Sequence, residues 1–289
     1  MPNIGIVLSG AASKGAYEIG CIKAIRDYFG MDSIKAMTTA SSGAIVAQAF
    51  GLGKIDEFAN AWKCIDTAKE GKFFLSYSGN NHILHELKNI LQDKAKKLPY
   101  EHYVSIWNFT KSKVEYIPFH MLSGERLWEY LRGAIAIPFF SKGSRVDGDL
   151  LLDGAFLDNI PVYPLVNKDL DYIFCVYFDN CQYSFENRDF DKKVIKLSDF
   201  PNSRMLGLMR FQPEEFDGMV SYGYDYTTST IKSIFEQDND VDIYERIENR
   251  EASLDKTFKP RLTADVVLNN INVATKKYSK RLSSRAKED

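Results

Sequence analysis

The sequence lacks several features by which common functional classes are recognised. Its four cysteines, Cys21, Cys64, Cys175 and Cys181, include no C-x-x-C pair, which argues against a zinc site and favours a reducing compartment. No stretch approaches the roughly 20 apolar residues that cross a bilayer. No basic segment precedes the apolar run at the N-terminus, so a cleaved signal peptide is not expected. These absences predict a cytoplasmic protein, with peripheral contact at membranes left open.

An excess of charge of either sign is also missing. The 37 Lys and Arg residues nearly balance the 39 Asp and Glu residues, which gives a net charge of -2 at pH 7. Without a basic field, nucleic acid is not an expected partner. The composition, 45% hydrophobic and 26% charged, is that of an ordinary globular protein, and 289 residues suffice for one large α/β domain with a sizeable core.

The familiar nucleotide-binding patterns are absent from the N-terminal loop. Residues 4–8 form a short apolar run typical of a buried strand, and residues 16–29 carry apolar side chains at helical spacing, followed by Gly30 as a helix cap. The small residues 9–15 between them match neither G-x-x-x-x-G-K-[ST] nor G-x-G-x-x-G. The free N–H groups at the start of the helix could instead hold a developing oxyanion, or the loop could be no more than a tight turn.

A second strand-to-helix turn follows within residues 35–50, KAMTTASSGAIVAQAF. Aligning the last glycine of G-x-S-x-G with Gly43 places Ser41 at the apex, with Thr39 where the first glycine would be. Two consecutive strand–helix units would bring Ser41 and the first loop to the same carboxyl edge of a parallel sheet, where α/β proteins gather their ligands. The pattern indicates a nucleophile elbow, although a Ser-Ser-Gly segment can also be an ordinary turn.

The rest of the chain is mostly scaffold. His82 and His85 share a face of one predicted helix, but no suitably spaced glutamate or third ligand accompanies them, so we expect a packed or solvated pair rather than a metal site. We predict helices at residues 54–69, 81–95, 123–131, 203–211 and 214–235 and from residue 263, a hairpin of residues 102–109 and 114–119, strands at 150–152 and 194–197, a short helix starting at 160 and a solvated loop at 236–248.

A carboxylate emerges at the end of the predicted strand 150–152, where Asp153 is followed by Gly154 and Ala155. In the Ser-Asp-His triads of α/β-hydrolases the histidine comes last along the chain. Here all four histidines precede Asp153. If Ser41 and Asp153 act together, they therefore do so without histidine. Asp-Gly turns are usually structural, so at this point the pairing is a hypothesis.

Three segments, in order, resemble the patatin-like phospholipase family. LSGAASKGAYEIGCIKAI is similar to its glycine-rich oxyanion loop and following helix, TASSGAI to its serine elbow, and AIPFFSKGSRVDGDLLLDGAFLDNIPV to its proline-containing segment and D-G-[GA] motif. The resemblance covers residues 4–180 and implies a three-layer α/β fold, with a mostly parallel central sheet and helices on both faces. Residues 1–180 would be the catalytic core, and residues 181–289 would complete the same domain and end in a basic tail.

The resemblance also implies roles for individual residues. Ser41 would be the nucleophile of a Ser-Asp dyad, and Asp153 would be its base. The oxyanion hole would be formed by Gly10, Ala11 and Ala12, with Lys14, Gly15, Gly43 and Gly154 in supporting positions. The family loop has three successive glycines, and alanine replaces two of them here; alanine still supplies an N–H, but its Cβ makes a positive φ costly by roughly 1 kcal/mol. The dyad requires no metal or other cofactor.

The substrate implied by the resemblance is a lipid acyl ester, either a glycerophospholipid or a lysophospholipid. Two alternatives stay open: a weakened or inactive patatin-like protein that only binds lipid, and an esterase or thioesterase for soluble acyl substrates. Apolar and basic groups suggest where lipid would bind. Phe73, Phe74, Phe139 and Phe140 could line an acyl-chain pocket or belong to the core. The C-terminal cluster could contact anionic headgroups or be a solvated helix end: Lys276, Lys277, Lys280, Arg281, Arg285 and Lys287.

Overall fold

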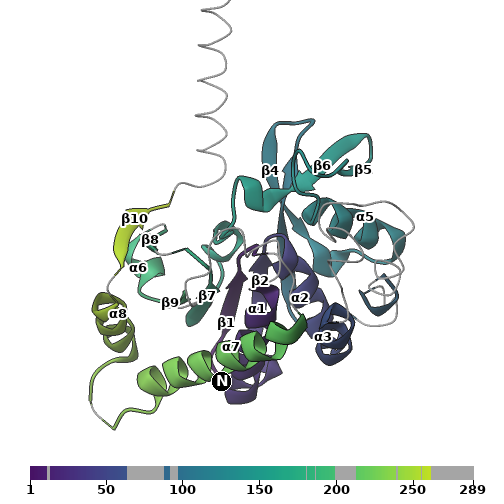
Figure 1. Ribbon diagram of the computed structural model, residues 1–289. Helices are drawn as coiled ribbons and strands as arrows, with labels where there is room; N and C mark the ends of the chain where they lie inside the picture. Colours follow the sequence, from purple (N-terminus) through teal and green to yellow (C-terminus); the bar gives the residue numbers. More distant parts are fainter. Residues whose placement is uncertain are drawn as a thin grey trace, which may run out of the picture.

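A central eight-stranded sheet organises the computed structural model of the protein, which describes residues 1–11, 14–63, 88–91, 97–179, 181–185, 187–198, 213–238, 240–254 and 256–261 (Figure 1). Its strands are β1 Ile4–Leu8, β2 Ile34–Thr39, β3 Glu101–Asn108, β4 Lys113–Pro118, β5 Ser144–Val146, β6 Asp149–Asp153, β7 Tyr172–Val176 and β9 Val194–Leu197. They are ordered β5-β6-β3-β2-β1-β7-β9, and β4 pairs with β3.

Most of the sheet is parallel, as the repeated strand–helix units predict. Strands β1, β2, β3, β7 and β9 share one direction. Strands β4 and β6 run antiparallel to β3, and β5 runs antiparallel to β6. A small second sheet pairs β8 (Cys181–Ser184) with β10 (Thr257–Pro260) in parallel. The expected α/β class with a mostly parallel central sheet is therefore confirmed.

Different segments of the chain pack on the two faces of the sheet. The described helices are α1 Gly15–Phe29, α2 Ser42–Gly51, α3 Ile55–Lys63, α5 Gly124–Ala134, α6 Arg188–Asp191, α7 Pro213–Phe235 and α8 Ile243–Ser253. Helices α1 and α2 lie on one face, and α7 packs along α1 (Figure 1). The other face is covered by residues 160–170, which include the short helix η5 (Tyr163–Leu165), and by aromatic side chains from residues 185 and 190.

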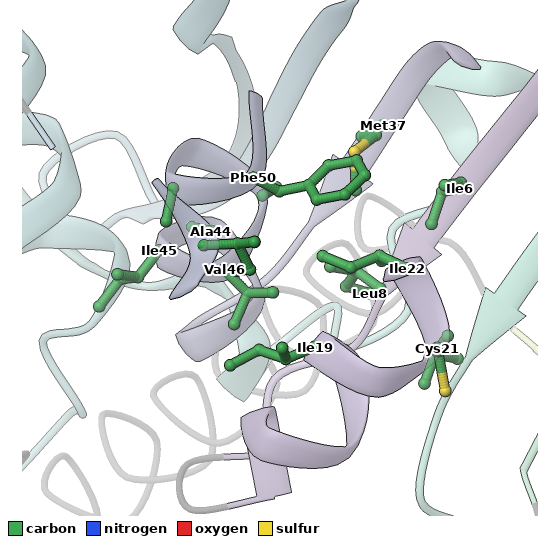
Figure 2. Packing of buried hydrophobic residues seen from close by; sticks show 14 of the residues in the cluster. Ile6, Leu8, Ile19, Cys21, Ile22, Met37, Ala44, Ile45, Val46 and Phe50 are labelled. Carbon is green, nitrogen blue, oxygen red and sulfur yellow. The ribbon is translucent and has the colours of Figure 1, made fainter. Parts of the chain in front are cut away.

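The alternation of side chains along β1 explains these two layers. Ile4, Ile6 and Leu8 point to the face covered by α1 and α2, where they join a large buried cluster. Figure 2 shows Leu8 lying among Ile22 and other side chains from α1 and α2. Val7 points to the opposite face and joins the smaller cluster. Because both faces of β1 are buried, its sequence is a continuous apolar run rather than an alternating one.

Several local predictions are confirmed. The predicted hairpin is β3 and β4, and the helices expected at residues 16–29, 123–131 and 214–235 are α1, α5 and α7. The helix predicted at 54–69 is present as α3, and the part beyond residue 63 lies outside the described residues. The predictions for residues 81–95, 203–211 and the chain after 261 also fall wholly or partly outside them.

Two local predictions are wrong. The solvated loop expected at residues 236–248 gives way to α8 from Ile243, because Asp242 caps the helix by accepting the Tyr244 N–H at 3.0 Å and because Ile247 is buried. The short helix expected from Ile160 begins only at Tyr163. A residue that precedes proline is disfavoured in the helical region, and residue 161 is proline.

Candidate active site

Ser41 lies at a sharp turn between β2 and α2. Its backbone has φ 49° and ψ -125°, a conformation that costs a non-glycine residue about 1–3 kcal/mol. The turn is connected to the end of β1 by a hydrogen bond in which the Ala40 N–H donates to Leu8 O at 3.1 Å. Ser41 precedes the first residue of α2, so the positive end of the helix dipole lies beside its hydroxyl. This is the geometry of the predicted nucleophile elbow.

Asp153 meets this turn because β2 and β6 share one edge of β3. Strand β4 occupies the other edge along residues 103–108. On the shared edge, Thr39 of β2 pairs with Val104, and Asp153 of β6 pairs with Ile106. These β3 partners are about 7 Å apart along the strand. Since β6 is antiparallel to β3 and β2 is parallel to it, the two strands end facing each other, and the residues that follow β2 meet the end of β6.

The Asp153 carboxyl is buried, with 3% of the residue exposed. Burial raises its pKa from 3.8 to about 7, and hydrogen bonds from the Ser41 hydroxyl and the Ala155 amide oppose that rise. The Ala155 N–H donates to Oδ1 at 2.9 Å, while the Asp153 N–H donates to Ala136 O at 2.9 Å. Hydrogen bonds therefore fix both the backbone and the side chain of Asp153, and its carboxylate can accept a proton near neutral pH.

The loop after β1 lies directly against the elbow. A Cβ on Gly10 would lie 2.5 Å from the Ser41 Cβ, so only glycine fits at that position without displacing the serine. The Ala11 N–H donates to Ser42 Oγ at 3.3 Å, which directs this amide at the elbow. The third predicted oxyanion-hole residue, Ala12, lies outside the described residues. Gly10 and Ala11 are thus brought together with Ser41, as the sequence predicts.

The supporting glycines are positions of close approach between elements. A Cβ on Gly43 would lie 2.9 Å from the Leu8 Cβ, where α2 starts over β1. One on Gly154 would lie 2.4 Å from the Ser105 carbonyl of β3, and one on Gly15 would lie 2.3 Å from a ring atom of Trp62. At each of these glycines, neighbouring elements lie too close together to admit a side chain.

Lys14 is placed at the start of α1, near the end of β7. It is only 7% exposed, and its Nζ lies 5.2 Å above the Phe178 ring. Burial lowers its pKa, and the charge of Asp179 opposes that change. The cation therefore contributes positive charge beside the first loop from a largely desolvated position.

Thr39 has a partner that sequence reasoning missed. Its Oγ1 lies 2.9 Å from Nε2 of His102 on the neighbouring strand β3, and both residues are fully buried. Burial, with His120 nearby, lowers the pKa of His102 to about 3, so the imidazole is neutral in ordinary conditions. The threonine that replaces the first elbow glycine thus fastens β2 to β3 two residues before Ser41. Nothing in the local spacing reveals a partner 63 positions away.

A second missed group lies just after Asp153. Asp158 is 4% exposed and accepts hydrogen bonds from the Tyr116 hydroxyl at 2.7 Å and from Arg261 Nη2 at 3.0 Å. Asp158 therefore connects the end of the described chain to the loop that follows the candidate base. Asn159 Oδ1 is buried and has no hydrogen-bond partner among the described residues, and it lies 3.0 Å from the place that a Cβ of Gly10 would occupy.

Other predicted binding residues do not join this site. Phe139 and Phe140 are 85% and 58% exposed, so the expectation that they line a pocket or the core is wrong. His82, His85, Phe73, Phe74 and the C-terminal basic cluster lie outside the described residues. A cavity of about 420 Å³ lies elsewhere, between α6, β9, α8 and β10. Within the part of the chain that is described, no helix is both long and apolar enough to span a membrane.

Comparison with known proteins identifies the family. The family model described as patatin-like phospholipase matches residues 6–166. An uncharacterized NTE family protein of Mycobacterium tuberculosis is 28% identical over 185 residues, which cover 58% of this chain and 48% of the relative. The lysophospholipase nte1 of Neurospora crassa is 27% identical over 186 residues, which cover 60% of this chain and 12% of the relative. The chain thus spans about half, or less, of the length of these relatives.

Solved structures give weaker similarity. VipD from Legionella pneumophila aligns with a TM-score of 0.47 and 15% identity, over 81% of this chain and 67% of that one. Human GIVD cytosolic phospholipase A2, in complex with methyl gamma-linolenyl fluorophosphonate, aligns with a TM-score of 0.45 and 11% identity, over 87% and 60%. The family model covers more than half of the sequence and includes both the Ser41 turn and Asp153. The chain belongs to the patatin-like phospholipase family, a family of lipid acyl hydrolases.

Proposed function

We propose that the protein is a serine lipid acyl hydrolase that cleaves carboxylic esters through a dyad of Ser41 and Asp153. The observation that carries this proposal is the meeting of the Ser41 turn with the end of β6, where Asp153 has a buried carboxyl whose pKa is raised to about 7. An aspartate at its reference pKa of about 3.9 is a poor base for a serine hydroxyl. A base poised near the working pH combines a useful ionised fraction with a stronger drive to accept the proton.

Acylation would begin with the ester carbonyl above the Ser41 turn. Ser41 Oγ attacks the carbonyl carbon while its proton passes to Asp153, and the C=O electron pair moves onto the carbonyl oxygen. Collapse of the tetrahedral intermediate breaks the bond to the leaving alcohol, which takes the proton from Asp153. Water then attacks the acyl-enzyme with Asp153 again as base, and the fatty acid leaves as Ser41 regains its proton.

The developing oxyanion would be stabilised by the loop after β1. The amides of Gly10 and Ala11 and the N-terminus of α1 would supply N–H groups and positive potential at that place. In the structure the Ala11 N–H is directed at Ser42 Oγ, and this contact is long at 3.3 Å. The oxyanion would therefore compete with a weak acceptor for that amide. Loss of one oxyanion-hole donor typically costs about 100- to 1,000-fold in rate.

The family and its relatives support a proposal for the substrate class. We propose an ester of the phospholipase A or lysophospholipase type, because the chain belongs to the patatin-like phospholipases and a relative from Neurospora crassa is a lysophospholipase. The Ser41–Asp153 chemistry acts on the ester carbonyl and does not require a particular headgroup. The sn-position and headgroup preference would be set by residues that contact the glycerol and its substituents.

Labelling with a fluorophosphonate probe tests the dyad. The wild type is expected to react, and tandem mass spectrometry should place the phosphonate on Ser41 rather than on the adjacent Ser42. Ser41→Ala should not react. Asp153→Asn should react far more slowly, because the hydroxyl loses its proton acceptor. Ser112, which lies in the β3–β4 turn, offers a control: Ser112→Ala should react like the wild type.

Hydrolysis assays then separate the proposal from its rivals. Release of fatty acid from lysophosphatidylcholine by the wild type, and its loss in Ser41→Ala, is the expected result. Equal background rates in the two proteins, together with no labelling, would instead support a family member that binds lipid without turnover. Hydrolysis of short soluble esters or thioesters, with none of lipid substrates, would reassign the substrate class and retain the dyad.

A further inference from the structure

Four aromatic rings form a continuous ridge beside the candidate base. Phe109 packs edge-on to Trp107 at 5.2 Å between ring centroids, Trp107 stacks on Phe156 at 5.5 Å, and Phe156 meets Phe139 edge-on at 6.0 Å. Phe140 follows Phe139 in the same turn. We call these four residues together with Phe140 the aromatic ridge: Trp107, Phe109, Phe139, Phe140 and Phe156. Phe156 lies three residues after Asp153, in the short helix η4 (Gly154–Phe156) that follows β6.

The ridge is open to solvent to an unusual degree for phenylalanine. Phe109, Phe139, Phe140 and Phe156 are 50%, 85%, 58% and 56% exposed, and Trp107 is half-buried. The rings come from the end of β3 and the β3–β4 turn, from the turn after α5 and from the segment after β6, which lie toward one end of the molecule (Figure 1). Contiguous exposed apolar surface of this kind marks a site of interaction.

Basic side chains next to the ridge have no acidic partner. Lys142 and Arg145 are exposed, and neither forms an ion pair with any other described residue. The acids of the neighbouring β5–β6 turn are already neutralised, since Asp147 pairs with Arg126 and Asp149 pairs with Lys111. The surface beside the exposed rings therefore presents positive charge that is available to an external anion.

We propose that the aromatic ridge and the adjacent Lys142 and Arg145 are the surface by which the protein docks on an anionic lipid bilayer. Aromatic rings enter the boundary between headgroups and acyl chains, and cations beside them bind anionic headgroups. The inference rests on the proposed function and deepens it, because it assigns the face from which a membrane ester reaches Ser41. The unpaired cations favour an anionic lipid surface over an apolar protein partner.

Vesicle binding by a protein that cannot turn over substrate tests the assignment. All variants carry Ser41→Ala, and flotation with vesicles of phosphatidylcholine and phosphatidylserine measures the partition coefficient. Phe139→Asn with Phe140→Ser should lower it by at least about tenfold. Asparagine suits residue 139, whose φ is 69°. Met121→Ser is the matched control: Met121 is 75% exposed, but it follows the end of β4 that pairs with Tyr103, away from the ridge.

Two further measurements sharpen the test. Lys142→Gln and Arg145→Gln should each lower binding to the anionic vesicles by about fivefold and leave binding to pure phosphatidylcholine unchanged.

Trp62 and Trp128 are 1% and 6% exposed, so quenching of fluorescence by brominated lipid reports on Trp107. That quenching should be present in the parent and absent in Trp107→Phe. Circular dichroism melts confirm that each variant is folded.

The outcomes separate the inference from the proposed chemistry. Loss of vesicle binding in the phenylalanine variant, with binding kept in Met121→Ser, supports the ridge as the membrane surface. Equal binding by both variants, or no binding by the folded parent, would overturn it, and the latter result would leave the ridge as a surface for a protein partner. Because Ser41→Ala performs no hydrolysis, failure of the proposed esterase activity would not change any of these values.

Discussion

The buried carboxyl of Asp153 should make the folded protein less stable at neutral and alkaline pH. We expect Asp153→Asn to unfold at a higher denaturant concentration than the wild type at pH 8, although the same change removes the proposed base. Asparagine has nearly the same shape and no charge, and its Oδ1 can still accept the Ala155 N–H that donates to Asp153 at 2.9 Å. The substitution therefore removes mainly the cost of ionising a carboxyl away from water.

The magnitude follows from the pKa. Burial raises the pKa of Asp153 from 3.8 to about 7, which corresponds to about 4 kcal/mol between the protonated and ionised forms. The folded state holds the proton more tightly than the unfolded state, so the penalty is absent below pH 3.8 and grows until the pH exceeds 7. Linkage gives a stability advantage of about 4 kcal/mol for Asp153→Asn at pH 8 and about 2 kcal/mol at pH 5.

Urea unfolding of both proteins at pH 8, 6.5 and 5, followed by circular dichroism, measures this difference. Asp147→Asn provides a control of opposite sign: Asp147 is exposed, and the Arg126 guanidinium lowers its pKa, so its substitution should not stabilise the protein at pH 8. A wild type as stable as Asp153→Asn at pH 8, or a difference that does not shrink toward pH 5, would refute the reasoning that burial holds the carboxyl near neutrality.

Three further predictions concern the same site. The kcat/KM for a soluble ester should rise with pH and level off above about 7, because the proposed base is Asp153. At pH 5, kcat/KM should be about a hundredth of its plateau value. His102 has a pKa of about 3 and cannot produce that inflection. Gly10→Ala should lower kcat by about 100-fold, because the Cβ of the introduced alanine would lie 2.5 Å from the Ser41 Cβ. Unimpaired turnover would show that the loop can move away from Ser41. Thr39→Val should cost about 1–3 kcal/mol in urea unfolding, because His102 Nε2 loses its buried partner at 2.9 Å; an unchanged midpoint would show that the contact contributes nothing.

The residues of the site were predictable from sequence where local chemistry fixes them. Small residues around Ser41 are needed for a strand to turn sharply into a helix, and the apolar run before Asp153 places that carboxyl at a strand end. What local patterns do not contain is the pairing of strands. Asp153 faces the Ser41 turn because β6 runs antiparallel to β3 and lies on the same edge of β3 as β2.

Contacts between residues far apart in sequence were missed for the same reason. His102 meets Thr39 only because β3 lies beside β2, and Arg261 reaches Asp158 across 103 positions. The exposure of Phe139 was missed for a different reason, because phenylalanine in an apolar segment is normally buried. Its environment depends on the turn after α5, whose backbone at this residue has φ 69°.

Two of the energetically unfavourable features of the chain have no explanation in folding alone, and they support the proposed function. Among the described residues, four that are not glycine have positive φ, and two of these, Ser112 and Asp147, belong to hairpin turns that explain them. The other two are Ser41 and Phe139. Ser41 is strained where it faces a buried carboxyl, and Phe139 is strained where it exposes an aromatic ring to water. Neither arrangement improves packing, and each costs stability, so a chain selected for folding alone would lose them. The proposed Ser41–Asp153 dyad and the proposed membrane surface would give these costs a common reason.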